Sequence, residues 1–241
     1  MPFLPRLELD VANELRWSVA ALVFANLLPL VGVLFFGWQT FDVVFLYWLE
    51  NVVIGLIALP KMAIAWGKVD KHDPSGPVGK VFSKLFSLPF FCFHYGLFCM
   101  GHGAFLFELL TPASHPQHGK ASSTFMDSQV MLNAVLAELS PWQVVAVTAL
   151  AASHLVSFLV NYLGRGEWRE RSTGEMMFAP YPRIMLLHVA LLVGGVLSLQ
   201  LGSPVIVLVL LVAGKTLLDY GMHLAEHEAA SEHQSSLATT T

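Results

Sequence analysis

Ionisable side chains recur inside stretches of the chain that are otherwise apolar. Each such residue costs about 2.5–3.5 kcal/mol on insertion scales when it enters a membrane helix, so by default it marks a candidate site. Their chemical types are imidazole, carboxylate and amine, which bind metals or carry protons. The residues are Glu50, His94, His154, His188, Lys215 and Asp219.

Part of this set suits a metal ion. His94 and His154 supply imidazole nitrogens and Glu50 a carboxylate, with further ligands at His102 or His188. Such nitrogen and oxygen ligands favour zinc or non-haem iron. A b-type haem would instead need two axial histidines from facing helices, for which His94 and His154 are the candidates. We therefore predict a metal or haem site formed by these residues.

A second set of side chains favours proton transfer. Chains of Asp, Glu, His and Lys carry protons in pumps and transporters. Lys215, Asp219 and His223 recur every four residues, so they lie along one helix face as a charge relay. Glu50 and Lys215 are also candidates for a buried ion pair, which is costly to assemble. The alternative hypothesis is thus a proton-coupled transporter of a small solute.

A third hypothesis is a membrane scaffold or assembly protein, in which polar residues only join helices. Asn51 and Asn161 supply supporting amides on two of the apolar stretches. Single polar residues in membrane helices commonly form interhelical hydrogen bonds. No catalytic residue stands out, and whether the chain is an enzyme stays open. The order His223-x-x-Glu226-His227 matches a zinc-peptidase motif, but it ends a membrane helix, so we assign no peptidase activity.

Composition indicates a membrane protein. The 241 residues are 55% hydrophobic and 12% charged, with a net charge of −4 and a mean hydropathy of +0.63. Soluble domains carry about twice that share of charged residues. The expected partner is therefore the lipid bilayer. The short basic clusters give no support for a nucleic-acid partner, and a homo-oligomer or another membrane partner stays open.

The elements that must position these residues are membrane helices. Apolar runs of about twenty residues suit spanning helices, and they lack the alternation of a lipid-facing strand. We predict an all-α polytopic bundle over residues 1–223, an outer loop at 110–141 and a flexible acidic tail at 224–241. The outer loop should contain a helix near 127–139, where apolar residues have helical spacing. The six predicted spans are about 17–36, 41–66, 82–109, 142–163, 184–201 and 205–223.

Basic residues indicate the orientation of the bundle. They precede the first span and follow the second and fourth, at Arg6, Arg16, Lys68, Lys71, Lys80, Lys84, Arg165, Arg169, Arg171 and Arg183. In the loops on the opposite side, the one lysine or arginine is Lys120. Because basic loops stay on the cytoplasmic side, both termini are expected in the cytoplasm.

Three short patterns carry a family resemblance. They are Tyr47-Trp48-Leu49-Glu50-Asn51, then His94-Tyr95-Gly96 with His102-Gly103, and finally Lys215 with Asp219 and His223. Together they resemble a multi-pass bacterial membrane protein family of unknown function. The resemblance implies a location in the bacterial inner membrane and adds no activity.

Overall fold

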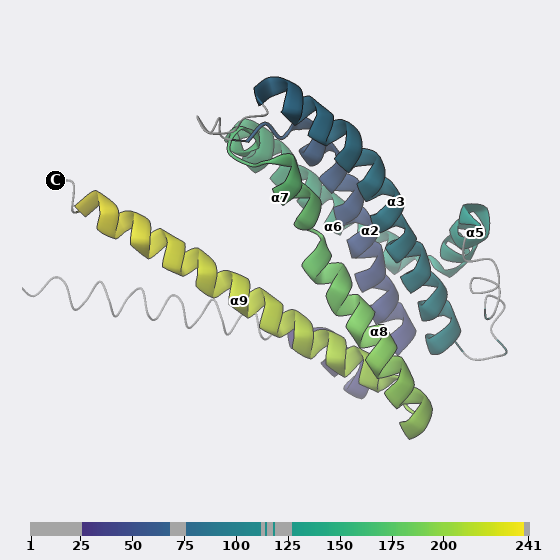
Figure 1. Cartoon of the computed structure of the whole chain (residues 1–241). Helices are drawn as coiled ribbons and strands as arrows, with labels where there is room; N and C mark the ends of the chain where they lie inside the picture. The colour runs from purple at the N-terminus through teal and green to yellow at the C-terminus, as the bar shows by residue number, and fades with distance from the viewer. Residues whose placement is uncertain (1–25, 68–75, 112–113, 115–117, 119–126, 239–241) are drawn as a thin grey trace, which may run out of the picture.

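The chain is helical throughout the part that the structure describes. The computed structural model describes residues 26–67, 76–111, 114, 118 and 127–238, without the side chains of 76–77 and 222–238 (Figure 1). These ranges contain helices and no strand, which confirms the all-α prediction. Helices long and apolar enough to cross a membrane lie at Thr40–Ile64, Val78–Leu110, Pro141–Gly164 and Thr173–Leu201.

The boundaries of the main helices lie close to the predicted ones. They are α2 (Thr40–Ile64), α3 (Gly76–Leu110), α6 (Pro141–Ser157), α8 (Tyr181–Leu201) and α9 (Val205–Ala238). Helix α9 begins at the predicted residue but continues past 223, where a flexible tail was expected. Of the first predicted span, 17–36, the structure describes only a shorter apolar helix at Asn26–Phe35. The count of six spans and the cytoplasmic termini therefore stay predictions.

Short helices connect the long ones. The predicted helix of the outer loop is present as α5 (Ser128–Glu138), and the carboxylate of Asp127 accepts hydrogen bonds from the backbone of Gln129 and Val130 at its start. Helices η2 (Glu167–Arg169) and α7 (Thr173–Phe178) lie between the fourth and fifth predicted spans. Side-chain caps such as the carboxylate of Asp127 satisfy the first backbone donors of a helix and fix where it begins.

Helix α6 continues without a break into a π-helix, η1 (Phe158–Gly164). The buried Tyr162 lies within it, and its hydroxyl donates a hydrogen bond to the carbonyl of Lys61 at 2.7 Å. This bond joins the end of the α6–η1 segment to the end of α2. π-Helical turns occur mostly as local insertions and often near functional sites.

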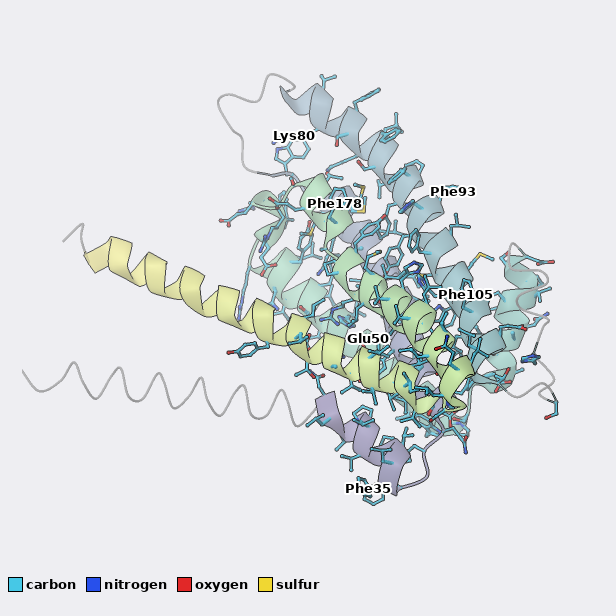
Figure 2. The ribbon with its side chains drawn as sticks, turned by 60° about the horizontal axis from the view of Figure 1, so that its bottom comes forward. Phe35, Glu50, Lys80, Phe93, Phe105 and Phe178 are labelled. Atoms are coloured by element: carbon cyan, nitrogen blue, oxygen red, sulfur yellow. The ribbon has the colours of Figure 1, made fainter. Side chains whose placement is uncertain are left out.

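Helix α2 forms the centre of the bundle, with contacts to α3, α6, α7, α8 and α9. The packing around α2 is aromatic. Phe45 stacks on Trp48, and the indole of Trp48 donates a hydrogen bond to the carbonyl of Cys99 on α3 at 2.8 Å. Other large side chains point away from the bundle, among them Phe93, which is 68% exposed, and Phe105 (Figure 2). An apolar exterior around a packed interior is the arrangement expected of a protein solvated by lipid.

Helices α8 and α9 form a hairpin. Gly202 ends α8 in the left-handed conformation, with φ of 68°. Earlier in α8, a Cβ atom added to Gly194 would lie 2.8 Å from the Cα of Val207 on α9. Small residues allow membrane helices to approach closely in this way. The hairpin brings the charged residues of α8 and α9 to the same side of α2.

Candidate functional site

Glu50 is the centre of the charged site. Its Oε1 accepts a hydrogen bond from Nη1 of Arg183 at 3.1 Å, and its Oε2 lies 3.7 Å from Nζ of Lys215. Nε2 of His154 lies 3.9 Å from Oε1. The carboxylate side chain is only 14% exposed. One largely buried carboxylate therefore faces a guanidinium group, an amine and an imidazole.

Each of these residues comes from a different helix. Glu50 lies on α2, His154 on α6, Arg183 on α8 and Lys215 on α9. Figure 2 shows Glu50 in the middle of the bundle, where these ribbons approach one another. The predicted pair of Glu50 with Lys215 is confirmed. Arg183 is a further member that the sequence analysis placed in a cytoplasmic loop.

A small cavity of about 30 Å³ adjoins these charges, and we call it the charged cavity. Its polar lining consists of Tyr47, Glu50, Asn51, Arg183, Lys215 and Asp219. A cavity needs about 10–15 Å³ to hold one water molecule, so this one has room for water. Asn51 is 7% exposed, and its Oδ1 has no hydrogen-bond partner among the described residues. A buried acceptor of this kind calls for a partner in the cavity.

Two further contacts fix the charges on α9. Nζ of Lys215 lies 4.8 Å from the centre of the Tyr47 ring, a cation–π contact. Oδ2 of Asp219 accepts a hydrogen bond from the amide of Asn26 at 3.0 Å. The charged cavity is thus lined by two acidic and two basic side chains, and its formal charge is balanced when all are ionised.

His94 belongs to a separate group on α3. Its Nδ1 lies 2.9 Å from the hydroxyl of Tyr181, and its ring stacks on Phe90. Tyr181 also contacts the rings of Phe91 and Tyr95 from the edge. His94 is therefore held by aromatic neighbours.

His102 and His188 form a second histidine contact. Nδ1 of His102 lies 2.6 Å from the carbonyl of Phe98, and its Nε2 lies 2.8 Å from Nδ1 of His188. A carbonyl only accepts, so Nδ1 of His102 carries the proton. When both rings are neutral, Nδ1–H of His188 donates to Nε2 of His102. This bond joins α3 to α8.

The predicted metal ligands are thus distributed over separate contacts. His154 lies beside Glu50, His94 beside Tyr181, and His102 beside His188. Within the described residues, no three His, Cys, Asp or Glu side chains come together to hold a metal ion. The expectation that Glu50, His94 and His154 form one ligand set finds no support in this geometry, and zinc, iron or haem binding stays a prediction.

The remaining predicted site residues are two asparagines and His223. The amide of Asn161 donates to Oγ of Ser157 at 3.3 Å, within the turn where α6 passes into η1. The amide of Asn51 donates to the carbonyl of Tyr47 at 2.9 Å. His223 lies on α9, but its side chain is outside the described residues.

Comparison with known protein families gives a match over nearly the whole chain. The family model described as Family of unknown function (DUF6498) matches residues 9–236. No curated protein and no solved structure matches the chain.

Proposed function

We propose that this chain, which belongs to the Family of unknown function (DUF6498), is a membrane protein that moves a small solute together with protons. The observation that carries the proposal is the contact of one largely buried carboxylate, Glu50, with Arg183, Lys215 and His154. Ionisable residues at membrane depth are expensive and mark ion and proton pathways.

The charge of Glu50 determines what holds Arg183 and Lys215 in place. As a carboxylate it is paired with Arg183 and Lys215, and once protonated it no longer neutralises either. Protonation thus changes what the two cations bind and how strongly α8 and α9 are held to α2. A charge change that alters helix contacts is the kind of switch by which proton binding biases a conformational equilibrium.

His154 and the charged cavity supply a route for the proton. The imidazole of His154 lies 3.9 Å from the carboxylate of Glu50, close enough to exchange a proton with it directly or through one water molecule. Histidine side chains serve as proton shuttles. The cavity beside Glu50 has room for about one or two water molecules, which extend such a chain.

The membrane setting completes the proposal. We place the protein in the bacterial inner membrane as a bundle of six spans with both termini in the cytoplasm. The basic segments around Lys80 and Arg169 support this orientation. In it, the connection at 110–141 faces outward, and the segment with η2 and α7 faces the cytoplasm.

Reconstituted protein tests the proposal. The purified full chain is placed in liposomes that contain a pH-sensitive dye, and sugars, amino acids, monocarboxylates and quaternary amines are added in turn. At least one solute should change the internal pH faster than in empty liposomes. Glu50→Gln should abolish this response, whereas Glu170→Gln, a change at an exposed carboxylate, should retain it. Equal responses in wild-type and empty liposomes for every solute would overturn the proposal.

A further inference from the structure

A series of hollows leads from one end of the bundle to Glu50. The outermost, which we call the mouth, has a volume of about 460 Å³ and is lined by Gly37, Trp38, Gln39, Asp42, Val43 and Trp142. The next, the apolar passage, has a volume of about 220 Å³. It shares Trp38, Val43 and Trp142 with the mouth, so the two hollows adjoin.

The apolar passage ends at the charged cavity. The two share Tyr47, Glu50 and Lys215, and so meet at the ion pair. Most of the remaining wall is apolar and includes Leu46 and Leu150. Ligand sites in proteins are concave, mainly apolar and equipped with few polar groups that fix orientation. The passage has this composition, with its polar groups gathered at its inner end.

From this arrangement we infer that the solute is a small monocarboxylate with an apolar or aromatic body, which enters at Trp38 and Trp142 and places its carboxylate on Lys215 and Arg183. The inference rests on the proposed function and names the solute class for the same site. Trp38, Trp142 and Tyr47 provide aromatic surface for the body. Lys215 and Arg183 provide the cationic partners for the head.

Charge balance couples an incoming anion to a proton. Glu50 and Asp219 balance Arg183 and Lys215 in the charged cavity. An added anion would leave one negative charge uncompensated in a poorly solvated site, which is costly. A proton taken from water by the carboxylate of Glu50 removes that excess. The cavity therefore accepts one monoanion together with one proton, and Glu50 gives up Lys215 and Arg183 to the incoming carboxylate.

Calorimetry on the detergent-purified full chain tests this inference, with benzoate as the probe. Benzamide has the same shape without charge, and benzylamine carries the opposite charge. Benzoate should bind, taking up about one proton in weakly buffered solution, and its affinity should fall about tenfold per pH unit where Glu50 is ionised. Both controls should bind at least about tenfold more weakly: benzamide lacks the charge for charge-assisted bonds, and benzylamine would add a positive charge beside Lys215 and Arg183.

Substitutions test the proton uptake, the cationic contact and the apolar passage one at a time. Glu50→Gln leaves the cavity with one excess positive charge, so it should bind benzoate without proton uptake and independently of pH. Lys215→Met should weaken benzoate binding about tenfold or more. Leu150→Trp fills the apolar passage and should block binding, whereas Leu155→Trp, at a side chain that is 49% exposed on the same helix, should not.

The outcomes distinguish this inference from the proposed function. Tighter binding of benzylamine, or no binding of benzoate, overturns the monocarboxylate inference. A copurified lipid chain that occupies the passage and excludes benzoate overturns it as well. If another solute still moves protons through Glu50 in liposomes, the proposed function stands without the inference. If no solute does so, both fail.

Discussion

Nη1 of Arg183 donates a hydrogen bond to Oε1 of Glu50 at 3.1 Å, although 133 residues separate the two along the chain. The bond joins the start of α8 to the middle of α2. Lys215 holds the other carboxylate oxygen from α9. Glu50 is therefore the point at which the α8–α9 hairpin is attached electrostatically to the central helix, and changes in its charge reach both helices.

Loss of Glu50 should cost more stability than loss of Lys215. Glu50→Gln leaves two cations without their partner and should lower the free energy of unfolding by about 3 kcal/mol. Lys215→Met leaves Arg183 in place on Glu50, so its cost should be clearly smaller. The double variant should recover part of the loss of Glu50→Gln. Denaturant titration in detergent measures these values, and equal losses for the two single variants would contradict the shared ion pair.

Close packing of α8 on α9 predicts a specific effect at Gly194. A Cβ atom there would lie 2.8 Å from the backbone of Val207, which no side-chain rotation relieves. Gly194→Ala should therefore destabilise the protein by about 1–3 kcal/mol. Gly96→Ala is the matched control, because a Cβ atom added at Gly96 would meet nothing within 4 Å. It should be neutral or stabilising, and similar losses at both sites would refute this packing.

The contact of His102 with His188 predicts a fixed tautomer. Nδ1 of His102 donates to the carbonyl of Phe98, so the neutral ring carries its proton on Nδ1. Nitrogen-15 NMR of histidine-labelled protein should show this form for His102, and His188→Ala should identify the partner signal. A neutral His102 with its proton on Nε2 would rule out the hydrogen bond to the carbonyl of Phe98 and would reverse the direction of the bond to His188.

Cysteine labelling tests the orientation. In a Cys92→Ala, Cys99→Ala background, Gln129→Cys should react with a membrane-impermeant maleimide on intact cells. Glu170→Cys should react only after permeabilisation. Both positions are exposed, so access alone does not separate them. The opposite pattern would reverse the orientation inferred from the basic loops.

Much of the fold follows from the sequence, because runs of apolar residues locate the long helices, although they did not show that α9 continues past 223. The pairing of Glu50 with Lys215 was also predictable, since both are residues of opposite charge within otherwise apolar stretches. Arg183 was not recognised as a site residue. Positive charges near span ends were counted only as orientation signals, whereas the long side chain of Arg183 extends from the first turn of α8 to Glu50.

Histidine partners were the least predictable feature. Their positions in two apolar stretches allowed His94 and His154 to converge, but side-chain directions depend on packing between helices. Stacking on Phe90 and contact with Tyr181 hold His94, while Glu50 lies beside His154. A tyrosine at the start of α8 gives no sequence signal that it will contact a histidine on α3.

The proposed function requires the carboxylate of Glu50, which faces Arg183 and Lys215, to gain and lose a proton. Infrared difference spectroscopy during a pH titration of the purified protein tests it most directly, because a protonated carboxyl group has its own carbonyl band. Wild-type protein should gain such a band as the pH falls, within the range where it stays folded, and the band should vanish in Glu50→Gln but persist in Glu170→Gln. A Glu50 that remains ionised throughout that range would contradict the proposed function. The contacts of Glu50 with Arg183 and Lys215 would then be a structural ion pair only.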